Sequence, residues 1–209
     1  MNKRNYNSEM ESIISTLNLR TPRLLLHSCC APCSSTCLEV LTPHFQVTIL
    51  YYNPNITDAS EYNLRLDEEK RFIETLNRNN GFQNGNDFHP ISIIDARYEP
   101  AEFFEAVKGY ESCPEGGDRC FICYEMRLRE AALTARSHGF DYFTTTLTLS
   151  PLKNCDKLNE IGQKLSDELN VAFLPSDFKK KDGYKRSIQL SNDSELYRQN
   201  YCGCIFSKR

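Results

Sequence analysis

Short apolar runs alternate with longer amphipathic stretches along most of the chain. The runs are rich in aliphatic, β-branched and aromatic residues, which predicts buried strands at 23–28, 46–52, 88–94, 142–145 and 171–174. Pro90 predicts that the third strand lies at a sheet edge or starts irregularly, because proline cannot donate to a strand ladder. Apolar residues spaced three and four apart predict helices from Asp58, over 100–108, from Gly117 to about Ser137 and over 155–169.

Strands that alternate with helices of this length predict an α/β fold, with a mostly parallel sheet and helices on both faces. Residues 1–21 are polar, and we expect an N-terminal extension with at most a short helix. Residues 22–209 form a single domain, whose tail over 178–200 is expected to be helical with a break near Gly183. Ligands of parallel sheets bind beyond the carboxyl ends of the strands, so the chemistry is expected after Ser28 and around 144–146.

Composition and charge narrow the class of protein. The 209 residues, 40% of them hydrophobic, suit one domain with a sizeable core. No apolar run approaches the ~20 residues that span a bilayer, and no apolar leader follows Lys3 and Arg4, so we expect a soluble cytoplasmic protein without membrane contact. The net charge is −3, yet residues 178–209 hold eight Lys or Arg against three acidic residues. This basic tail indicates either a solvated face or a local anionic partner.

Ten cysteines are the unusual feature of the composition. Without a secretory context they indicate metal ligation or redox catalysis rather than structural disulfides. Cys29, Cys30 and Cys33 follow the first strand directly, in a turn that Pro32 stiffens, so that their sulfurs can face one metal centre. Packing of three such thiols as plain buried hydrophobes is the weaker interpretation. Cys37 follows one turn later if a helix starts here.

A second pair, Cys120 and Cys123, lies at a predicted helix start, where residues three apart share one face and thiolates are stabilised. By itself this spacing is compatible with zinc, an iron–sulfur cluster or a redox dithiol. Together with Cys29 and Cys30 it provides four thiolates, which suit zinc and a [4Fe–4S] cluster equally well. The spacing leaves both metals open.

A third pair, Cys202 and Cys204, flanks Gly203 near the end of the chain. Such a pair can close a small strained disulfide, since glycine tolerates the backbone that it needs, and strained disulfides are typically the catalytic ones. The alternative is that these two sulfurs are further metal ligands.

These cysteines belong to five ordered sequence blocks. The blocks are LHSCCAPCS at 26–34, YYNPNI at 51–56, PEGGDRCFIC at 114–123, FTTTL at 143–147 and YCGCIFS at 201–207. In this order they resemble the QueH family, the non-cobalamin epoxyqueuosine reductases, over about Leu24 to Ser207. One block alone is weak evidence, whereas five in order are highly specific.

The resemblance implies an adenine-nucleotide α-hydrolase-like fold of Rossmann-like type. It implies that the protein reduces epoxyqueuosine to queuosine at the wobble position of tRNA, the last step of queuosine biosynthesis. It also implies a [4Fe–4S] cluster held by Cys29, Cys30, Cys120 and Cys123, and a redox-active pair formed by Cys202 and Cys204. Three cysteines outside the family blocks receive no role and are expected to be buried thiols: Cys37, Cys113 and Cys155.

The chemistry of these residues agrees with such a reaction. Conversion of an epoxide to an alkene consumes two electrons and two protons and releases water. A [4Fe–4S] cluster passes one electron at a time, whereas a dithiol holds two, and an exposed iron can polarise the epoxide oxygen. The electron donor stays unidentified, and Cys33 with a sulfur of the third pair is a candidate site for a second iron. The candidate proton donors are His27, Tyr51, Tyr52 and Tyr201, although a lone histidine at a strand end is more often a structural residue.

The substrate side is less sharply defined. The basic residues of 179–186 are candidates for anticodon-arm phosphates, and Tyr52, Tyr184 and Phe206 for stacking on an unstacked base. Two alternatives stay open. One is a nucleotide-dependent tRNA-modifying enzyme of the same fold, although cysteines occupy the place of its phosphate loop after the first strand. The other is a zinc-stabilised tRNA-binding module.

Overall fold

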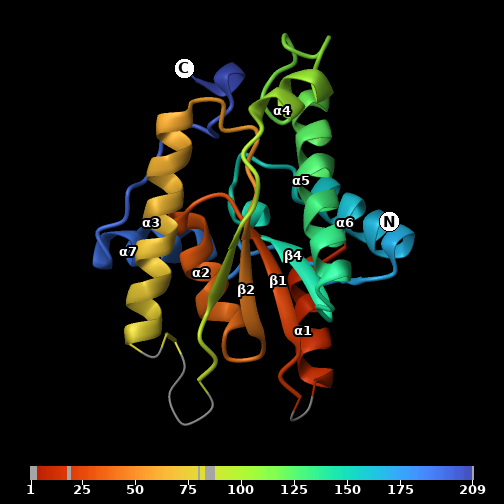
Figure 1. The fold of residues 1–209 in the computed structure, drawn as a ribbon. Helices are drawn as coiled ribbons and strands as arrows, with labels where there is room; N and C mark the ends of the chain where they lie inside the picture. The colour runs from red at the N-terminus through yellow and green to blue at the C-terminus, as the bar shows by residue number, and fades with distance from the viewer. Residues whose placement is uncertain (1–3, 18–19, 80, 83–87, 209) are drawn as a thin grey trace.

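The computed structural model describes residues 4–17, 20–79, 81–82 and 88–208, and its helices flank a central sheet (Figure 1). The strands are β1 (Arg23–Ser28), β2 (Gln46–Tyr51), β3 (Ser92–Asp95), β4 (Tyr142–Thr145) and β5 (Ala172–Phe173). The α-helices are α1 (Tyr6–Thr16), α2 (Ala31–Leu41), α3 (Ala59–Arg78), α4 (Pro100–Ala106), α5 (Asp118–Ser137), α6 (Cys155–Leu169) and α7 (Gly183–Asp193). Two short 3₁₀ helices are η1 (Thr146–Leu149) and η2 (Ile205–Ser207).

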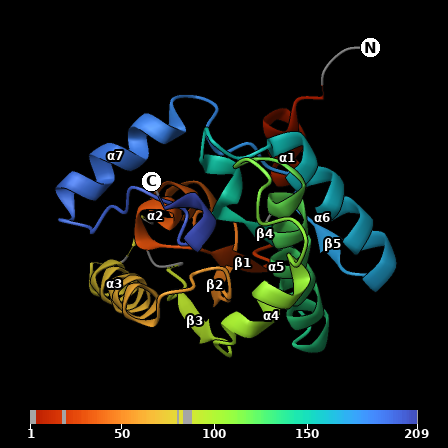
Figure 2. The same ribbon diagram turned by 90° about the horizontal axis from the view of Figure 1, so that it is seen from above.

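The five strands form one sheet in the order β3-β2-β1-β4-β5, and every neighbouring pair is parallel. The central strand β1 pairs with β2 on one side and with β4 on the other (Figure 2). The prediction of a parallel α/β fold is therefore confirmed. The short strand β3 lies at an edge, as Pro90 predicted, because a proline there needs no ladder partner.

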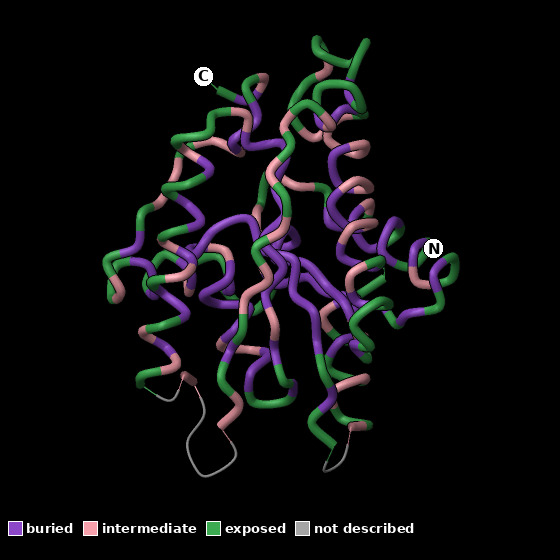
Figure 3. Tube along the Cα trace, in the orientation of Figure 1, coloured by how far each residue is buried: buried purple, intermediate pink, exposed green. Residues whose placement is uncertain are grey.

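The two faces of the sheet carry separate cores. Leu25 points into a cluster formed with α5 and α6, whereas Leu24 and Leu26 point into a cluster formed with α2 and α3. This alternation follows from the two-residue period of a strand. Buried residues accordingly concentrate along the strands and on the inward faces of the helices (Figure 3). Helices cover both faces, which confirms that part of the prediction.

Local signals explain where several helices begin. The Asp58 carboxylate caps α3 by accepting from the backbone N–H groups of Ser60 and Glu61. Pro32 occupies the first turn of α2, where its missing N–H costs nothing. The helix that starts after Cys30 places Cys37 inside the core of the α2 face.

The C-terminal region differs from the prediction. A helix broken near Gly183 was expected over 178–200, but the helix begins at Gly183 and ends at Asp193. The reason is steric: a Cβ at position 183 would lie almost on the Phe178 carbonyl oxygen, and Asp182 before it adopts φ +61°. The loop expected over 77–87 falls largely outside the described residues, and α3 continues to Arg78.

The N-terminal segment forms α1, whose Met10 is buried in the core of the α2 face. Whether 1–21 is an extension to a domain of 22–209 stays a prediction. Among the described helices, none combines the length and apolar character needed to cross a membrane.

Candidate active site

The first group of thiols lies where β1 leads into α2. Cys30 is the N-cap of α2, and its carbonyl accepts from the Cys33 backbone N–H at 3.0 Å, which closes the turn. The sulfurs of Cys29 and Cys30 lie 3.7 Å apart, and with Cys33 they form a group within 4.8 Å of one another. In the described part of the chain, this is the one group of three or more potential ligand atoms that is so compact. We call it the β1 thiol group.

The three thiols of the β1 thiol group differ in acidity. Hydrogen bonds from Cys30 and Cys33 hold the pKa of Cys29 well below its ordinary value. The same hydrogen bonds raise the pKa of Cys30 and Cys33, because each donates its proton to Cys29. The N-terminus of α2 adds to the stabilisation of a thiolate here. Cys29 is therefore the most acidic of the three thiols, and the group has the donor atoms of a metal-binding site.

The second group of thiols lies at the start of α5. The Gly116 backbone N–H donates to the Cys120 sulfur at 3.2 Å, and Cys123 is buried one turn later. Burial raises the pKa of Cys123 to about 12. Cys123 and Cys204 pack in the same small apolar cluster, so α5 and the C-terminal tail bring their sulfurs to one place.

The tail over 197–207 is held across the carboxyl end of the sheet by hydrogen bonds to its backbone and side chains. The Arg65 guanidinium donates to the carbonyls of Tyr201 and Cys202, both at 3.3 Å, and the Thr57 N–H donates to the Gly203 carbonyl at 3.2 Å. The Gln199 side-chain amide donates to the Cys30 sulfur at 2.8 Å. These contacts fix the third cysteine pair beside the other two, although they are far apart in sequence.

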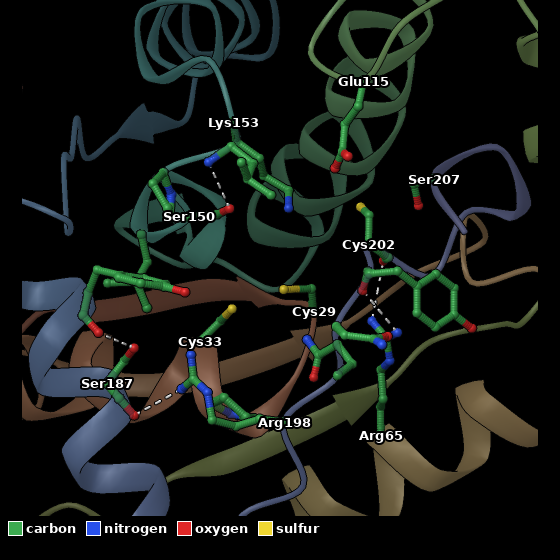
Figure 4. A pocket seen from close by; sticks show the side chains of 18 of the residues that line it. Cys29, Cys33, Arg65, Glu115, Ser150, Lys153, Ser187, Arg198, Cys202 and Ser207 are labelled. Carbon is green, nitrogen blue, oxygen red and sulfur yellow. Dashed lines mark hydrogen bonds between the residues drawn. The ribbon is translucent and has the colours of Figure 1, made fainter. Parts of the chain in front are cut away.

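The three segments border a cavity of about 320 Å³ at the carboxyl end of the sheet, which we call the main cavity. Cys29, Cys202 and Lys153 lie on different walls of it (Figure 4). A narrow second cavity is lined by the sulfurs of Cys120, Cys123, Cys202 and Cys204. The two cavities share several wall residues, namely Glu115, Arg127, Leu152, Lys153, Cys202 and Ser207. Residues of all three cysteine segments thus line two adjoining cavities.

Buried cations line this space. Arg127 is 1% exposed and donates to the Asn55 side-chain oxygen at 2.6 Å, while its Nε and Nη2 have no partner among the described residues. A buried guanidinium without a carboxylate is costly, so the site calls for a negative group. Burial lowers the pKa of Lys153, but the nearby sulfurs of Cys202, Cys29 and Cys33 raise it above its ordinary value overall. A thiolate-bound iron–sulfur cluster fits both the sulfur donors and the unpaired guanidinium donors.

The family model described as "Epoxyqueuosine reductase QueH" matches residues 24–209. The chain belongs to the QueH family. A protein of that name from Staphylococcus epidermidis is 44% identical over 209 residues, covering 98% of this chain and 85% of the relative. Another from Staphylococcus aureus is 42% identical, with coverage of 98% and 84%, and one from Thermotoga maritima is 35% identical, with coverage of 88% and 89%. The chain is thus an epoxyqueuosine reductase, an oxidoreductase of queuosine biosynthesis that modifies tRNA.

The four cysteines predicted to hold a cluster lie in two separate pairs. Cys29 and Cys30 lie together, and Cys120 and Cys123 line the adjoining cavity, but no compact group of ligand atoms joins the two pairs within the described residues. Four thiolates around a single zinc ion lie about 3.8 Å apart, given Zn–S bonds of about 2.3 Å, whereas a cuboidal cluster spreads them further. The four-cysteine set stays a prediction. Cys37 and Cys155 are buried, whereas Cys113 is half-buried.

Two of the expected proton donors, His27 and Tyr52, have hydrogen-bond partners within the protein. The Tyr52 carbonyl can only accept, so His27 Nε2 donates to it, and Nδ1 of the neutral ring accepts from the Thr145 hydroxyl. The Thr145 oxygen in turn accepts from the Leu147 N–H. Burial lowers the pKa of His27 to about 3, which agrees with a structural, hydrogen-bonded role for this residue. The Tyr52 hydroxyl donates to Glu102 at 2.7 Å.

The two remaining candidates, Tyr51 and Tyr201, differ in whether they reach the main cavity. Tyr51 is fully buried, and its hydroxyl faces the Tyr62 carbonyl at 3.5 Å. Tyr201 lines the main cavity. Of the tyrosines expected to donate a proton, Tyr201 is therefore the one that faces the site.

The basic residues of 179–186 are largely paired with acids. Lys179 bonds Asp177 at 2.7 Å, Lys181 pairs with Glu11, and Arg186 with Glu39. The cations that line the main cavity are others, namely Arg65, Arg127, Lys153 and Arg198. None of the four was predicted as a site residue, although Arg198 belongs to the basic tail of residues 178–209. Arg127 follows Cys123 by four residues on α5, so the shared helical face was a usable signal for it.

Proposed function

We propose that the protein reduces epoxyqueuosine at the wobble position of tRNA with the help of a [4Fe–4S] cluster. Cys29 and Cys30 from the end of β1 and Cys120 and Cys123 from the start of α5 would hold it. Bound there, the cluster supplies single-electron transfer and a Lewis-acidic iron. The observation that carries the proposal is that these cysteines lie around two adjoining cavities, both lined by Arg127, whose guanidinium has unpaired donors.

We further propose that Cys202 and Cys204 form the redox dithiol. Two thiols supply two electrons and two protons when they become a disulfide, which balances the loss of the epoxide oxygen as water. Support comes from their location, since Cys202 lines both cavities and Cys204 lies beside Cys123. Cys33 belongs to the β1 thiol group and is our candidate ligand for a second iron. An electron donor, still unidentified, then reduces the disulfide again.

For the tRNA, we propose that the modified nucleotide leaves its stack and enters the main cavity. The guanidinium of Arg198 and the ring of Tyr184 lie 5.9 Å apart on its wall, an arrangement that suits a phosphate and a base. A tRNA substrate also supports a cytoplasmic location. The parallel strand order 3-2-1-4-5 supports membership of the adenine-nucleotide α-hydrolase-like folds.

Metal analysis tests the proposal against both alternatives. After anaerobic purification, we expect about four iron and four sulfide per chain and reduction of epoxyqueuosine-containing tRNA, read by mass spectrometry of its nucleosides. Stoichiometric zinc without iron would favour the zinc module, and a requirement for ATP the nucleotide-dependent enzyme. Cys123→Ser should lose the iron, whereas the matched variant Cys37→Ser, whose thiol lies in the apolar core, should keep it.

A further inference from the structure

One charged side chain of the cavity has no assigned role and no partner. Lys153 lies in the loop between η1 and α6, beyond the carboxyl end of β4, and lines both cavities. Its ammonium makes no hydrogen bond or ion pair with any described residue. Glu115, the one carboxylate of the described main-cavity wall, forms no ion pair with it either. An unpaired ammonium that faces a cavity is available to a ligand.

The position of Lys153 relates it to the reacting part of the substrate. The β1 thiol group and Cys202 lie on different walls of the main cavity, and Lys153 reaches the same space from a third wall (Figure 4). An epoxide that receives electrons from sulfur or iron at this place lies among these groups. The atom of an epoxide that takes up protons when its ring opens is the epoxide oxygen, so this oxygen is the atom that a proton donor at this place would serve.

The other three cations of the main cavity either have partners in the protein or cannot donate a proton. Arg65 is tied to Glu61 and to the carbonyls of the tail. Arg198 donates to the Ser187 carbonyl at 3.1 Å and to the Ser191 hydroxyl at 2.9 Å. Arg127 keeps free donors, but a guanidinium does not release its proton in proteins. Among the four cations that line the main cavity, Lys153 is thus the one that can both bind an oxygen and give it a proton.

We propose that Lys153 is the general acid of the reduction: its ammonium binds the epoxide oxygen and gives it a proton as the carbon–oxygen bond breaks. The inference rests on the proposed function. One oxygen leaves as water after taking two protons, the two ring carbons gain a double bond with two electrons, and the dithiol of Cys202 and Cys204 supplies both electrons as it forms a disulfide. The dithiol releases two protons as it is oxidised. One of them returns to Lys153, and the other is the second proton that the leaving oxygen takes up to form water. Because an alkoxide is more basic than an amine, this transfer is favourable.

The test compares variants of the iron-loaded protein in a single turnover with saturating tRNA that contains epoxyqueuosine. We expect Lys153→Met to keep its iron and to lose about 10²–10⁴-fold in rate. The matched control is Lys157→Met, which removes a lysine that pairs with Glu160 outside the cavity and should react like the wild type. A wild type without activity would overturn the proposed function, whereas an active wild type with an equally active Lys153→Met would overturn only the role of Lys153.

Two further measurements separate proton donation from charge. Lys153→Arg keeps a cation that cannot release its proton, and we expect it to be as slow as Lys153→Met. Added ethylammonium should restore part of the rate of Lys153→Ala, while tetramethylammonium, which has charge but no proton, should not. A wild-type rate for Lys153→Arg, or equal rescue by both ions, would contradict the proposal.

Discussion

The glycine between the two tail cysteines has a conformation that other residues rarely adopt. Gly203 has φ +101°, and a Cβ built on it would lie 2.8 Å from Ile56 Cγ1 and 3.3 Å from Arg65 Nη1. Ile56 is fully buried, so it cannot move aside. The positive φ costs about 1–3 kcal/mol for alanine and the overlap about as much again, which gives about 2–6 kcal/mol in total. Gly203→Ala should therefore shift the tail away from its docked position.

Alkylation of the reduced protein measures this shift. Cys204 is buried in the docked tail, and each 1.4 kcal/mol is about a tenfold change in an equilibrium, so we expect its alkylation rate to rise at least about tenfold. Turnover should fall, because the dithiol no longer faces the cavity, while the iron content stays the same. Peptide mass spectrometry after a timed pulse of iodoacetamide gives the rate for each cysteine.

The control carries backbone strain without the overlap. Gly139 also has a positive φ, of +67°, but a Cβ there would lie 3.9 Å from Arg23 Nη1, which is an ordinary contact. Gly139→Ala should destabilise the fold slightly and leave Cys204 protected. If Cys204 in Gly203→Ala is alkylated no faster than in Gly139→Ala, the tail is not held by the contacts described above.

Two further predictions concern the cysteines and a buried acid. Cys202→Ser should keep its iron but lose multiple turnover, whereas Cys123→Ser should lose the iron, since a hydroxyl is a poor cluster ligand; loss of iron from both variants would make Cys202 a ligand. Burial raises the pKa of Glu69 from 4.5 to about 8, so the folded protein keeps a proton that the unfolded chain releases. Stability should therefore fall as the pH rises from about 4.5 to about 8, and Glu69→Gln should flatten this slope in urea unfolding; an unchanged slope would assign it to other groups.

Local patterns were sufficient for most of the fold. The apolar run of β1 and the Asp58 cap of α3 are properties of neighbouring residues, and the strand–helix alternation then requires a parallel sheet. The start of α7 at Gly183 was not predictable in this way, because it depends on the close approach of the Phe178 carbonyl, a contact of the folded chain.

The site was predictable where its residues come in motifs. Cysteine pairs can be recognised from their spacing in the sequence. Single residues such as Lys153 and Arg198 belong to no such motif. Lys153 becomes notable only once β4 lies beside β1 and brings the following loop to the same end of the sheet. The tail contacts of Arg65 span more than a hundred residues, and no periodicity encodes them.

The charges of the cavity link its sulfurs to its cations. Arg127 has a neutral amide as its described hydrogen-bond partner, and burial of its charge costs several kcal/mol unless negative charge lies nearby. Burial lowers the pKa of Arg127, whereas the nearby sulfurs of Cys123, Cys202 and Cys29 raise it above its ordinary value overall. Thiols of all three segments would therefore compensate the guanidinium once they are ionised, as they are when they bind a metal. A bound phosphate would serve the guanidinium equally well but would leave the thiols unused. The arrangement of sulfur around a buried cation therefore favours a metal bound by cysteines over a nucleotide at this end of the sheet.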